Sequence, residues 1–314
     1  MAELNFLDHV RSLILAAAEN PAPPLASLSV EEVRAARNPV LIDHLGPPEP
    51  VAGVEDLPLW VKDGEITLRV YTPKGPGPFP GLVYFHGGGW VVGNLETHDS
   101  LCRALANAAA CVVVAVDYRL SPEHKFPVAV EDAFSATLWA AENSRRLNCL
   151  PGALAVAGDS AGGGLAASVC LLARDRGGPE LKLQLLVYPV TDLSSFDRPS
   201  YRDYWDKLIL TGESMGYFRE AYLARPEDGL DPLASPLLAE SLAGLPPALV
   251  ITAEHDVLTS DGQEYAARLK KAGVKTACLS FPGTIHLFFG MAALNRRENG
   301  LEAAARALRQ ALAS

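Results

Sequence analysis

The sequence predicts an α/β fold in which helices cover both faces of a mostly parallel central sheet. Apolar runs typical of buried strands alternate with helical stretches along most of the chain. The pentapeptide Gly-Asp-Ser-Ala-Gly at residues 158–162 lies between one such run and the helical stretch 161–174. A length of 314 residues suits one core that carries its extra length as insertions. The core strands are expected at residues 81–85, 111–116, 153–157, 183–188, 249–252 and 276–281.

Two helices are predicted before the sheet. In the first, apolar side chains between residues 6 and 17 recur at helical spacing, and Asn20 and the prolines after it end the helix. The second begins at Ser29, whose side chain pairs with Glu32 in a capping box. It is expected to stop before Pro39, because a proline disfavours helix at the residue that precedes it.

The first strands differ in their expected exposure. Ile66, Leu68 and Val70 alternate with polar neighbours, as in a half-exposed strand. Residues 81–85 are apolar throughout, as in a strand buried on both faces. This buried strand leads directly into the run His-Gly-Gly-Gly-Trp at residues 86–90.

The interval between Tyr188 and Leu249 breaks the alternation, because it contains no core strand. Its dense aromatic and aliphatic side chains suit a lid that binds apolar substrate. The alternative is that they only pack the insertion onto the core. These side chains belong to Tyr201, Tyr204, Trp205, Leu208, Ile209, Leu210, Met215, Tyr217, Phe218 and Tyr222.

Composition and charge exclude several classes of protein. Apolar residues make up 49% of the chain and charged residues 20%, which excludes a disordered protein. The formal net charge of −10 comes without any basic run, so neither nucleic acid nor a membrane surface is expected as a partner. The 5 cysteines include no C-x-x-C pair, so neither a disulfide framework nor a metal site is expected.

The N-terminus shows no pattern typical of a secretory signal. Its apolar run at residues 13–18 follows the acidic Glu3 and Asp8, where a signal peptide would carry Lys or Arg. No window reaches the roughly 18 apolar residues that a membrane-spanning helix needs. We therefore expect a cytoplasmic protein.

Ser160 is the candidate nucleophile. On a sharp turn between strand and helix, its hydroxyl would be lifted above the end of the sheet. Glycines would flank it because a Cβ at either position would collide with the neighbouring strand or helix. The alternative is a glycine-rich helix start with a capping serine, and the partners of Ser160 argue against it.

A serine hydroxyl needs a base to accept its proton and a third group to orient that base. Among the 7 histidines, His286 lies in a loop beyond the last predicted strand, where it can reach the nucleophile turn. The required order of Ser, then acid, then His selects Ser160, Asp256 and His286. Asp256 follows a core strand at the carboxyl end of the sheet, where ligand sites lie. Glu254 and Asp261 are the alternative acids.

Acyl transfer also needs donors for the oxygen that becomes negative in the tetrahedral intermediate. Consecutive glycines let main-chain N–H groups approach that oxygen without obstruction, so Gly88 and Gly89 are candidates together with the N–H of Ala161. A phosphate-binding loop is the alternative reading of the glycine run. It lacks both G-x-G-x-x-G and Gly-Lys-Ser/Thr, so no nucleotide and no other cofactor is expected.

The sequence resembles the bacterial hormone-sensitive-lipase family of α/β-hydrolase carboxylesterases, in its GDSAG branch. The resemblance covers nearly the whole chain and lies in several blocks that stand in the family's order. These blocks are HGGGW at 86–90, DYRLSPEHKFP at 117–127, GDSAGG at 158–163, YPV at 188–190, LPPALVITAEHD at 245–256 and PGTIH at 282–286.

This resemblance implies the α/β-hydrolase fold with a helical cap. Ser160, Asp256 and His286 would be the catalytic triad. The oxyanion hole would consist of Gly88, Gly89 and Ala161. The implied division is cap helices at 1–50, core at 51–190, cap insertion at 191–235 and core at 236–314. We expect substrate to be bound by Trp90, Tyr188, Trp205, Leu208 and Leu287.

The sequence departs from the family pattern at Gly164, Val257 and Leu287, where the family usually has Asn, Pro and Gly. None of these changes removes a catalytic group. Leu287 adds bulk beside His286, so the family's acyl-chain preference does not transfer directly.

The block at residues 117–127 is expected to be structural. Its charged side chains lie beside a strand end, which favours an ion-pair and hydrogen-bond network that braces the glycine loop. The side chains in question are Asp117, Arg119, Glu123 and His124.

The leading hypothesis is a serine carboxylesterase without metal or cofactor, which hydrolyses short to medium acyl esters through an acyl-enzyme. Its partners would be a small ester and water, and a homodimer through exposed edge strands is compatible with the sequence. An amide or formamide hydrolase would use the same triad. A non-catalytic ligand receptor is the third hypothesis, and the presence of His286 argues against it.

Overall fold

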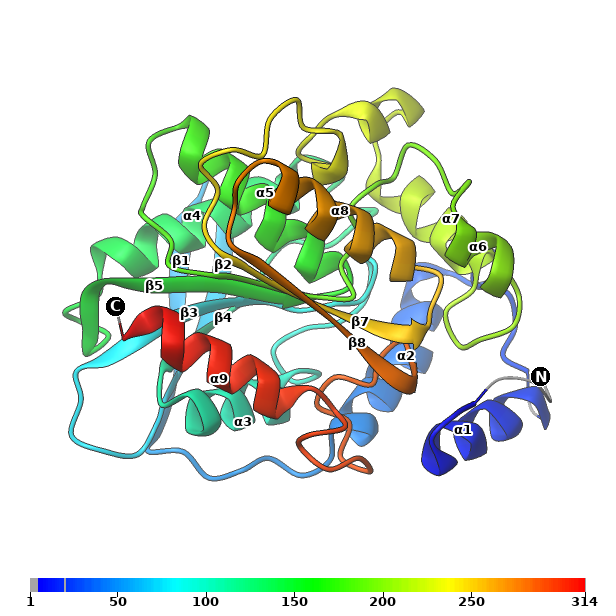
Figure 1. Ribbon diagram of the computed structural model, residues 1–314, viewed down its shortest axis with the longest axis horizontal. Helices are drawn as coiled ribbons and strands as arrows, with labels where there is room; N and C mark the ends of the chain where they lie inside the picture. The colour runs from blue at the N-terminus through cyan, green and yellow to red at the C-terminus, as the bar shows by residue number, and fades with distance from the viewer. Residues whose placement is uncertain (1–4, 20, 314) are drawn as a thin grey trace.

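The computed structural model describes residues 5–19 and 21–313. A twisted sheet runs through the middle of the molecule, and helices cover both of its faces (Figure 1). Residues 1–4 and Asn20, which the sequence places before and at the end of the first helix, lie outside the described residues. The α/β fold class is thereby confirmed, with the strands in the predicted order along the chain.

Within the described residues the sheet has 8 strands in the order β1-β2-β4-β3-β5-β6-β7-β8. Strand β2 is antiparallel to both of its neighbours, and every other pair of neighbours is parallel. The strands are β1 (Gly53–Val61), β2 (Gly64–Thr72), β3 (Phe79–Phe85), β4 (Val112–Asp117), β5 (Cys149–Asp159), β6 (Gln184–Val187), β7 (Ala248–His255) and β8 (Thr276–Ile285).

The helices lie in two layers and in a group beside the end of the sheet that carries the carboxyl ends of the parallel strands (Figure 1). Helices α4, α5 and α8 cover one face, and α3 and α9 cover the other. The α-helices are α1 (Asp8–Glu19), α2 (Val30–Leu45), α3 (Asp99–Ala109), α4 (Val128–Glu142), α5 (Ala161–Asp175), α6 (Pro199–Tyr204), α7 (Gly212–Tyr222), α8 (Thr259–Lys271) and α9 (Leu301–Leu312). Short 3-10 turns lie at Leu25–Ser27, Pro226–Leu230 and Pro236–Leu238.

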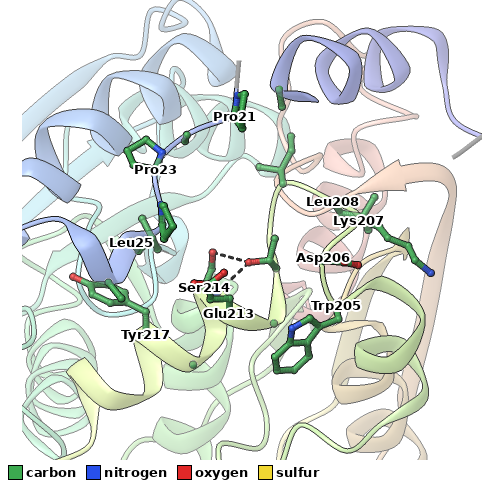
Figure 2. A pocket seen from close by; sticks show the side chains of 18 of the residues that line it. Pro21, Pro23, Leu25, Trp205, Asp206, Lys207, Leu208, Glu213, Ser214 and Tyr217 are labelled. Carbon is green, nitrogen blue, oxygen red and sulfur yellow. Dashed lines mark hydrogen bonds between the residues drawn. The ribbon is translucent and has the colours of Figure 1, made fainter. Parts of the chain in front are cut away.

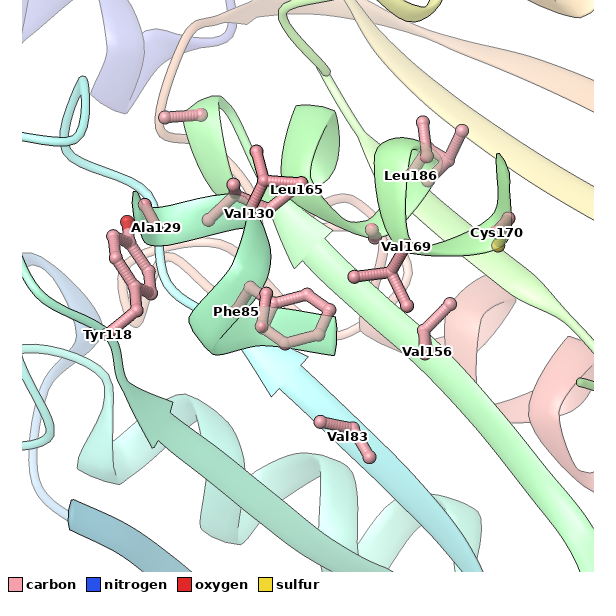
Figure 3. Close-up of a cluster of buried hydrophobic side chains, with 14 of the residues drawn as sticks. Val83, Phe85, Tyr118, Ala129, Val130, Val156, Leu165, Val169, Cys170 and Leu186 are labelled. Atoms are coloured by element: carbon pink, nitrogen blue, oxygen red, sulfur yellow. The ribbon is translucent and has the colours of Figure 1, made fainter. Parts of the chain in front are cut away.

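Helix α5 is the most deeply buried helix, because its residues from Ala161 to Ala173 are all buried. Figure 3 shows its Leu165 and Val169 packed with Phe85 of β3 and Val156 of β5. A helix that is apolar all round belongs in the interior. The start of this helix is therefore held by the core on every side, which fixes the position of Ser160.

The topology brings chain segments that are far apart in sequence to one edge of the sheet. Parallel strands end at the same edge, and the segments that follow β3, β5, β7 and β8 begin with His86, Ser160, Asp256 and His286. This edge lies beside helices α1, α2, α6 and α7 (Figure 1).

Strand β1 was not predicted. It is an edge strand paired only with β2, and Leu57 is its one buried residue. The strand has only a short alternation, in which Leu57, Leu59 and Val61 face the core. The exposed apolar Trp60 stands between two of them, so the polar half of the pattern is missing.

The predicted end of the second helix was wrong, although its start was right. The Ser29 capping box with Glu32 is present, but α2 continues through Pro39 to Leu45. Contacts with the core lie on both sides of the proline: Asn38 accepts from Gly93 N at 3.0 Å, and His44 Nε2 lies 2.7 Å from Leu287 O. A proline inside a helix removes one backbone hydrogen bond, and tertiary contacts of this kind can offset that loss.

The block 117–127 contacts the glycine loop through hydrogen bonds and also forms ion pairs. Tyr118 donates its hydroxyl to His86 O at 2.8 Å, and Ser121 N donates to Trp90 O at 2.8 Å. The ion pairs of the block are made with partners outside it. Arg119 pairs with Asp132 of α4, and Glu123 pairs with Arg34 of α2.

No helix among residues 5–19 and 21–313 combines the length and the apolar character needed to cross a bilayer.

Candidate active site

Ser160 lies on the sharp turn between β5 and α5, with backbone angles of φ 56° and ψ −120°. Residues other than glycine rarely adopt a positive φ of this kind, so the backbone of the turn is strained. A Cβ on Gly158 would lie 2.2 Å from Gly162 O, and a Cβ on Gly162 would lie 2.0 Å from Phe85 O. The close approach of strand and helix at this turn therefore requires glycine on both sides of Ser160.

His286 connects Ser160 to Asp256. Its Nε2 lies 3.1 Å from Ser160 Oγ, and its Nδ1 lies 2.7 Å from Asp256 Oδ2. A carboxylate only accepts hydrogen bonds, so Nδ1 carries the proton and Nε2 is free to accept one from the serine. All three residues are buried, with 7%, 6% and 1% of Ser160, His286 and Asp256 exposed.

The two alternative acids do not contact His286. Glu254 accepts a hydrogen bond from Gly283 N at 2.7 Å, which supports the loop that carries His286. Asp261 points into the core, where it accepts from the N–H groups of Thr191 and Asp192. Burial raises the pKa of Asp261 to about 8 even though Arg198 opposes the shift. The structure therefore brings only Asp256, of the three candidate acids, to the imidazole.

The glycine loop after β3 faces Ser160. Gly88 and Gly89 have φ of 122° and 60°, and both line the cavity that contains Ser160. A Cβ on Gly88 would lie 2.1 Å from Val92 O, and one on Gly89 would lie 2.3 Å from the ring of Phe218. The N–H groups of Gly88, Gly89 and Ala161 find no acceptor in the described part of the chain. Ala161 is the first residue of α5, where helix N–H groups are unpaired.

A buried polar network holds this loop to the nucleophile turn. Asp159 accepts from Tyr84 Oη at 2.7 Å and from Gly87 N at 3.0 Å, and lies 3.3 Å from His98 Nε2. Burial alone would raise the pKa of Asp159, but His98 and Tyr84 outweigh it, so the pKa lies below its usual value. Burial and the neighbouring His98 lower the pKa of His86 to about 3, so this imidazole stays neutral.

Ser160 opens into a small inner cavity of about 100 Å³. On the sheet side of this cavity, the segments that follow β3 and β5 contribute glycines and polar groups. On the helical side, α2, α7 and the segment before α7 contribute mostly apolar side chains. The lining residues are Leu25, Arg37, Val40, Leu41, Gly87, Gly88, Gly89, Val92, His98, Asp159, Ser160, Ile209, Leu210, Ser214, Phe218, His286 and Leu287.

A larger outer cavity of about 900 Å³ adjoins it. Figure 2 shows this cavity between Pro21 to Leu25 on one side and Trp205 to Leu208 on the other, with Glu213, Ser214 and Tyr217 of α7 at its base. Leu25, Arg37, Ile209 and Ser214 line both cavities. The two cavities therefore meet along α2, α7 and the segment before α7.

The predicted substrate-binding residues lie in different places. Leu287 lines the inner cavity, whereas Trp205 and Leu208 line the outer one. Trp90 lines neither, because its ring is buried and stacks on Tyr222 with ring centroids 4.1 Å apart.

Tyr188 also lines neither cavity, and its ring lies behind the imidazole of His286, with centroids 4.4 Å apart. Trp90 and Tyr188 therefore pack against other side chains and do not face either cavity.

The sequence analysis missed the contribution of α2 to the inner cavity. Arg37, Val40 and Leu41 stand at positions i, i+3 and i+4 of this helix, which places them on one face. The helix was expected to end before Pro39, so this face was not recognised. The spacing of Arg37, Val40 and Leu41 was the sequence signal that could have indicated it.

The remaining side chains to consider are potential metal ligands and the cysteine thiols. In the described part of the chain, no group of three or more His, Cys, Asp or Glu side chains could hold a metal ion. The cysteines are free thiols, and burial raises the pKa of both Cys111 and Cys149 to about 12, so neither forms a thiolate near neutral pH.

Comparison with known proteins identifies the family and the fold. A family model described as the α/β-hydrolase fold matches residues 82–290. The carboxylic ester hydrolase LipN of Mycobacterium tuberculosis is 48% identical over 226 residues, which are 70% of this chain and 60% of LipN. This chain thus spans less than two thirds of LipN.

Two further relatives match over more of their length. An arylesterase of Saccharolobus solfataricus is 39% identical over 272 residues, which cover 85% of this chain and 87% of the arylesterase. The crystal structure of an α/β-hydrolase enzyme from the metagenome of Lake Arreo has a TM-score of 0.93 at 38% identity and covers 99% of both chains.

Proposed function

This chain belongs to the α/β-hydrolase family, among the carboxylesterases of the hormone-sensitive-lipase type, and from that premise we propose that it hydrolyses carboxylic esters with Ser160 as nucleophile. The single observation that carries the proposal is the position of His286, whose two ring nitrogens contact Ser160 and Asp256. We also assign the chain to the GDSAG branch of the family, on the basis of the pentapeptide at residues 158–162.

In the proposed reaction, Ser160 Oγ attacks the ester carbonyl carbon while His286 Nε2 takes the hydroxyl proton. Asp256 keeps the proton on Nδ1 and stabilises the imidazolium that forms. The protonated Nε2 then donates to the leaving alkoxide, which departs as the alcohol. Water attacks the acyl-enzyme by the same sequence, with His286 as base, and releases the acid.

We assign the oxyanion hole to the N–H groups of Gly88, Gly89 and Ala161. They are unpaired among the described residues and lie on two segments that meet at Ser160. Such donors stabilise the negative oxygen of the tetrahedral intermediate without reorganising during the reaction. The strained turn at Ser160 positions the third donor, because Ala161 is the next residue.

The proposed substrates are esters of short to medium acyl chains, bound under a cap made of residues 1–50 and 191–235. An inner cavity of about 100 Å³ suits a small acyl group, and the outer cavity of about 900 Å³ has room for a larger alcohol or a longer chain. The side chains of Phe218, from α7, and Leu287, from the loop after β8, both line the inner cavity and limit its size.

We further propose a cytoplasmic location and a homodimer formed through an edge strand. Free cysteine thiols are typical of a reducing compartment. Strands β1 and β8 are the edges of the sheet and are the surfaces to which a second copy could add. Light scattering after gel filtration measures the oligomeric state, and a monomer at micromolar concentration contradicts this part of the proposal.

The proposed function is tested with Ser160→Ala and His286→Ala assayed on a short acyl ester and on the matched anilide. Each variant is expected to lower kcat by about 10⁴-fold or more. His124→Ala, which changes an exposed histidine away from both cavities, is the control. Near-normal ester turnover by either site variant rejects the assignment, and a wild-type enzyme faster on the anilide identifies an amide hydrolase.

A further inference from the structure

Arg37 stands at the junction of the two cavities. Of the Lys and Arg side chains in the described part of the chain, it is the one that lines the inner cavity with Ser160, and it lines the outer cavity as well. It comes from α2, on the helical face that also presents Val40 and Leu41. The partly buried Arg37 therefore lies where the outer cavity meets the inner cavity that contains Ser160.

Arg37 has no partner in the described part of the chain, neither a hydrogen bond nor an ion pair. Arg34, one turn earlier on the same helix, is by contrast fully paired with other groups of the protein. It binds both carboxylate oxygens of Glu123 and donates to the carbonyls of Val91 and Ser121. Burial lowers the pKa of Arg37 and no carboxylate opposes this, whereas the hydrogen bond to Glu123 raises the pKa of Arg34.

Among the described residues, none of the acidic side chains that line the two cavities forms an ion pair with Arg37, so its positive charge is not compensated. Asp159, the carboxylate of the inner cavity, already accepts from Tyr84 and Gly87 and pairs with His98. The acids of the outer cavity, Asp206, Glu213 and Glu220, make no ion pair with Arg37. A guanidinium stays charged near neutral pH, and leaving a partly buried charge unpaired costs stability unless a ligand pairs with it.

We propose that Arg37 binds an anionic group of the substrate, so that the preferred esters carry a carboxylate a few bonds from the scissile carbonyl, as in half-esters of dicarboxylic acids. The planar fork of a guanidinium matches a carboxylate with two parallel hydrogen bonds. A dianionic phosphate in the inner cavity would leave one charge uncompensated, because among the described residues no second Lys or Arg lines that cavity, and Lys207 and Arg219 line only the outer one. This proposal rests on the proposed esterase function.

The experiment compares monoethyl glutarate with its apolar isostere, in which an isopropyl group replaces the carboxylate. The wild-type enzyme is expected to show the higher kcat/KM on the half-ester. Arg37→Gln should lower kcat/KM for the half-ester by about ten- to a hundredfold, mainly through KM, because a hydrogen bond to a charged group is lost. The isostere should change by less than about twofold, since it makes no ionic contact with Arg37.

Two further variants control for charge and for folding. Arg306→Gln makes the same change at an exposed position of α9 that lines neither cavity, and it should leave both substrates unaffected. Arg37→Lys keeps the charge and should retain part of the preference for the half-ester. An equal loss on both substrates in Arg37→Gln, or a wild-type preference for the isostere, overturns the proposal.

Binding can be measured separately from turnover. In Ser160→Ala, calorimetry should detect monoethyl glutarate, and the added change Arg37→Gln should weaken its affinity by about tenfold or more. Equal affinity in the two variants overturns the role of Arg37. Persistent ester turnover by Ser160→Ala would instead overturn the proposed function, so the two failures are distinct.

Discussion

The two sides of the candidate active site are built differently. On the sheet side, the nucleophile turn and the glycine loop are buried, and a Cβ on Gly88 or Gly162 would lie within about 2 Å of a main-chain oxygen, at 2.1 and 2.0 Å. On the helical side, two cavities remain between α2 and the segment that leads into α7. Here Val40 and Trp205 are 56% and 44% exposed.

This difference assigns separate tasks to the two sides. In the proposed reaction, the sheet side holds the reacting groups, whose positions tolerate very little change because main chain contacts main chain. The helical side would meet the substrate through cavity-lining side chains such as Phe218 and Arg37, which can change without moving the nucleophile. Changes on the sheet side should therefore lower kcat for every ester, and changes on the helical side should alter which ester is preferred.

The largest effect is expected at the acid that orients His286. Asp256→Asn should lower kcat by about 10³- to 10⁴-fold on all esters, because an amide no longer holds the imidazole in the required tautomer. Glu254→Gln is the matched control, since its oxygen can still accept from Gly283 N. Steady-state kinetics check both variants, and a larger loss in Glu254→Gln than in Asp256→Asn would reverse the assignment of the acid.

A somewhat smaller effect is expected at the glycine loop. Gly88→Ala should lower kcat by about 10²- to 10³-fold, because its Cβ would push the loop away from Val92 O and displace an oxyanion donor. KM should change little. Circular dichroism checks that the variant is folded. Full kcat in a folded Gly88→Ala would show that the loop does not supply the donors.

On the helical side, Phe218→Ala should change selectivity more than rate. The ring of Phe218 closes the inner cavity against Gly89, so its removal should raise the preference for longer acyl chains by about tenfold. Turnover of an acetate ester should stay within about threefold of wild type. A panel of esters of increasing chain length gives the measurement. An unchanged chain-length profile would contradict the separation of tasks between the two sides.

The smallest effect concerns stability rather than turnover. Burial raises the pKa of Asp261 to about 8, so the folded protein binds this proton more tightly than the unfolded chain. Stability should therefore fall as pH rises from about 4 to about 8, and Asp261→Asn should remove part of this fall. The amount by which the Tm of the variant exceeds that of wild type should be about 2–4 °C larger at pH 9 than at pH 6. Equal differences at both pH values would contradict the buried, protonated carboxyl.

The sheet side of the site could be read from the sequence, whereas the helical side could be read only in part: cavity-lining residues such as Leu208 and Phe218 were recognised in the insertion, but those of α2 were not. Glycines at 88, 89, 158 and 162 and the order of Ser160, Asp256 and His286 are local patterns, and the topology brings them to one edge of the sheet. The order of the strands along the chain could also be predicted, because each buried strand is a distinct apolar run in the sequence.

What the sequence did not show depends on tertiary contacts. Strand β1 is mostly exposed, and its short apolar alternation at Leu57, Leu59 and Val61 is interrupted by the exposed Trp60. Helix α2 runs through Pro39 because Asn38 and His44 bind the core on either side of it. Trp90 was expected to bind substrate, but its ring is buried and stacks on Tyr222.

The most direct test of the account is the position of covalent labelling by a fluorophosphonate, a reagent that reacts with activated serines. Mass spectrometry of the labelled peptides should find one adduct per chain, on Ser160, with ester turnover lost in parallel. His286→Ala should slow the labelling strongly. An adduct on a different residue, or an enzyme that stays unlabelled while it hydrolyses esters, would contradict the account.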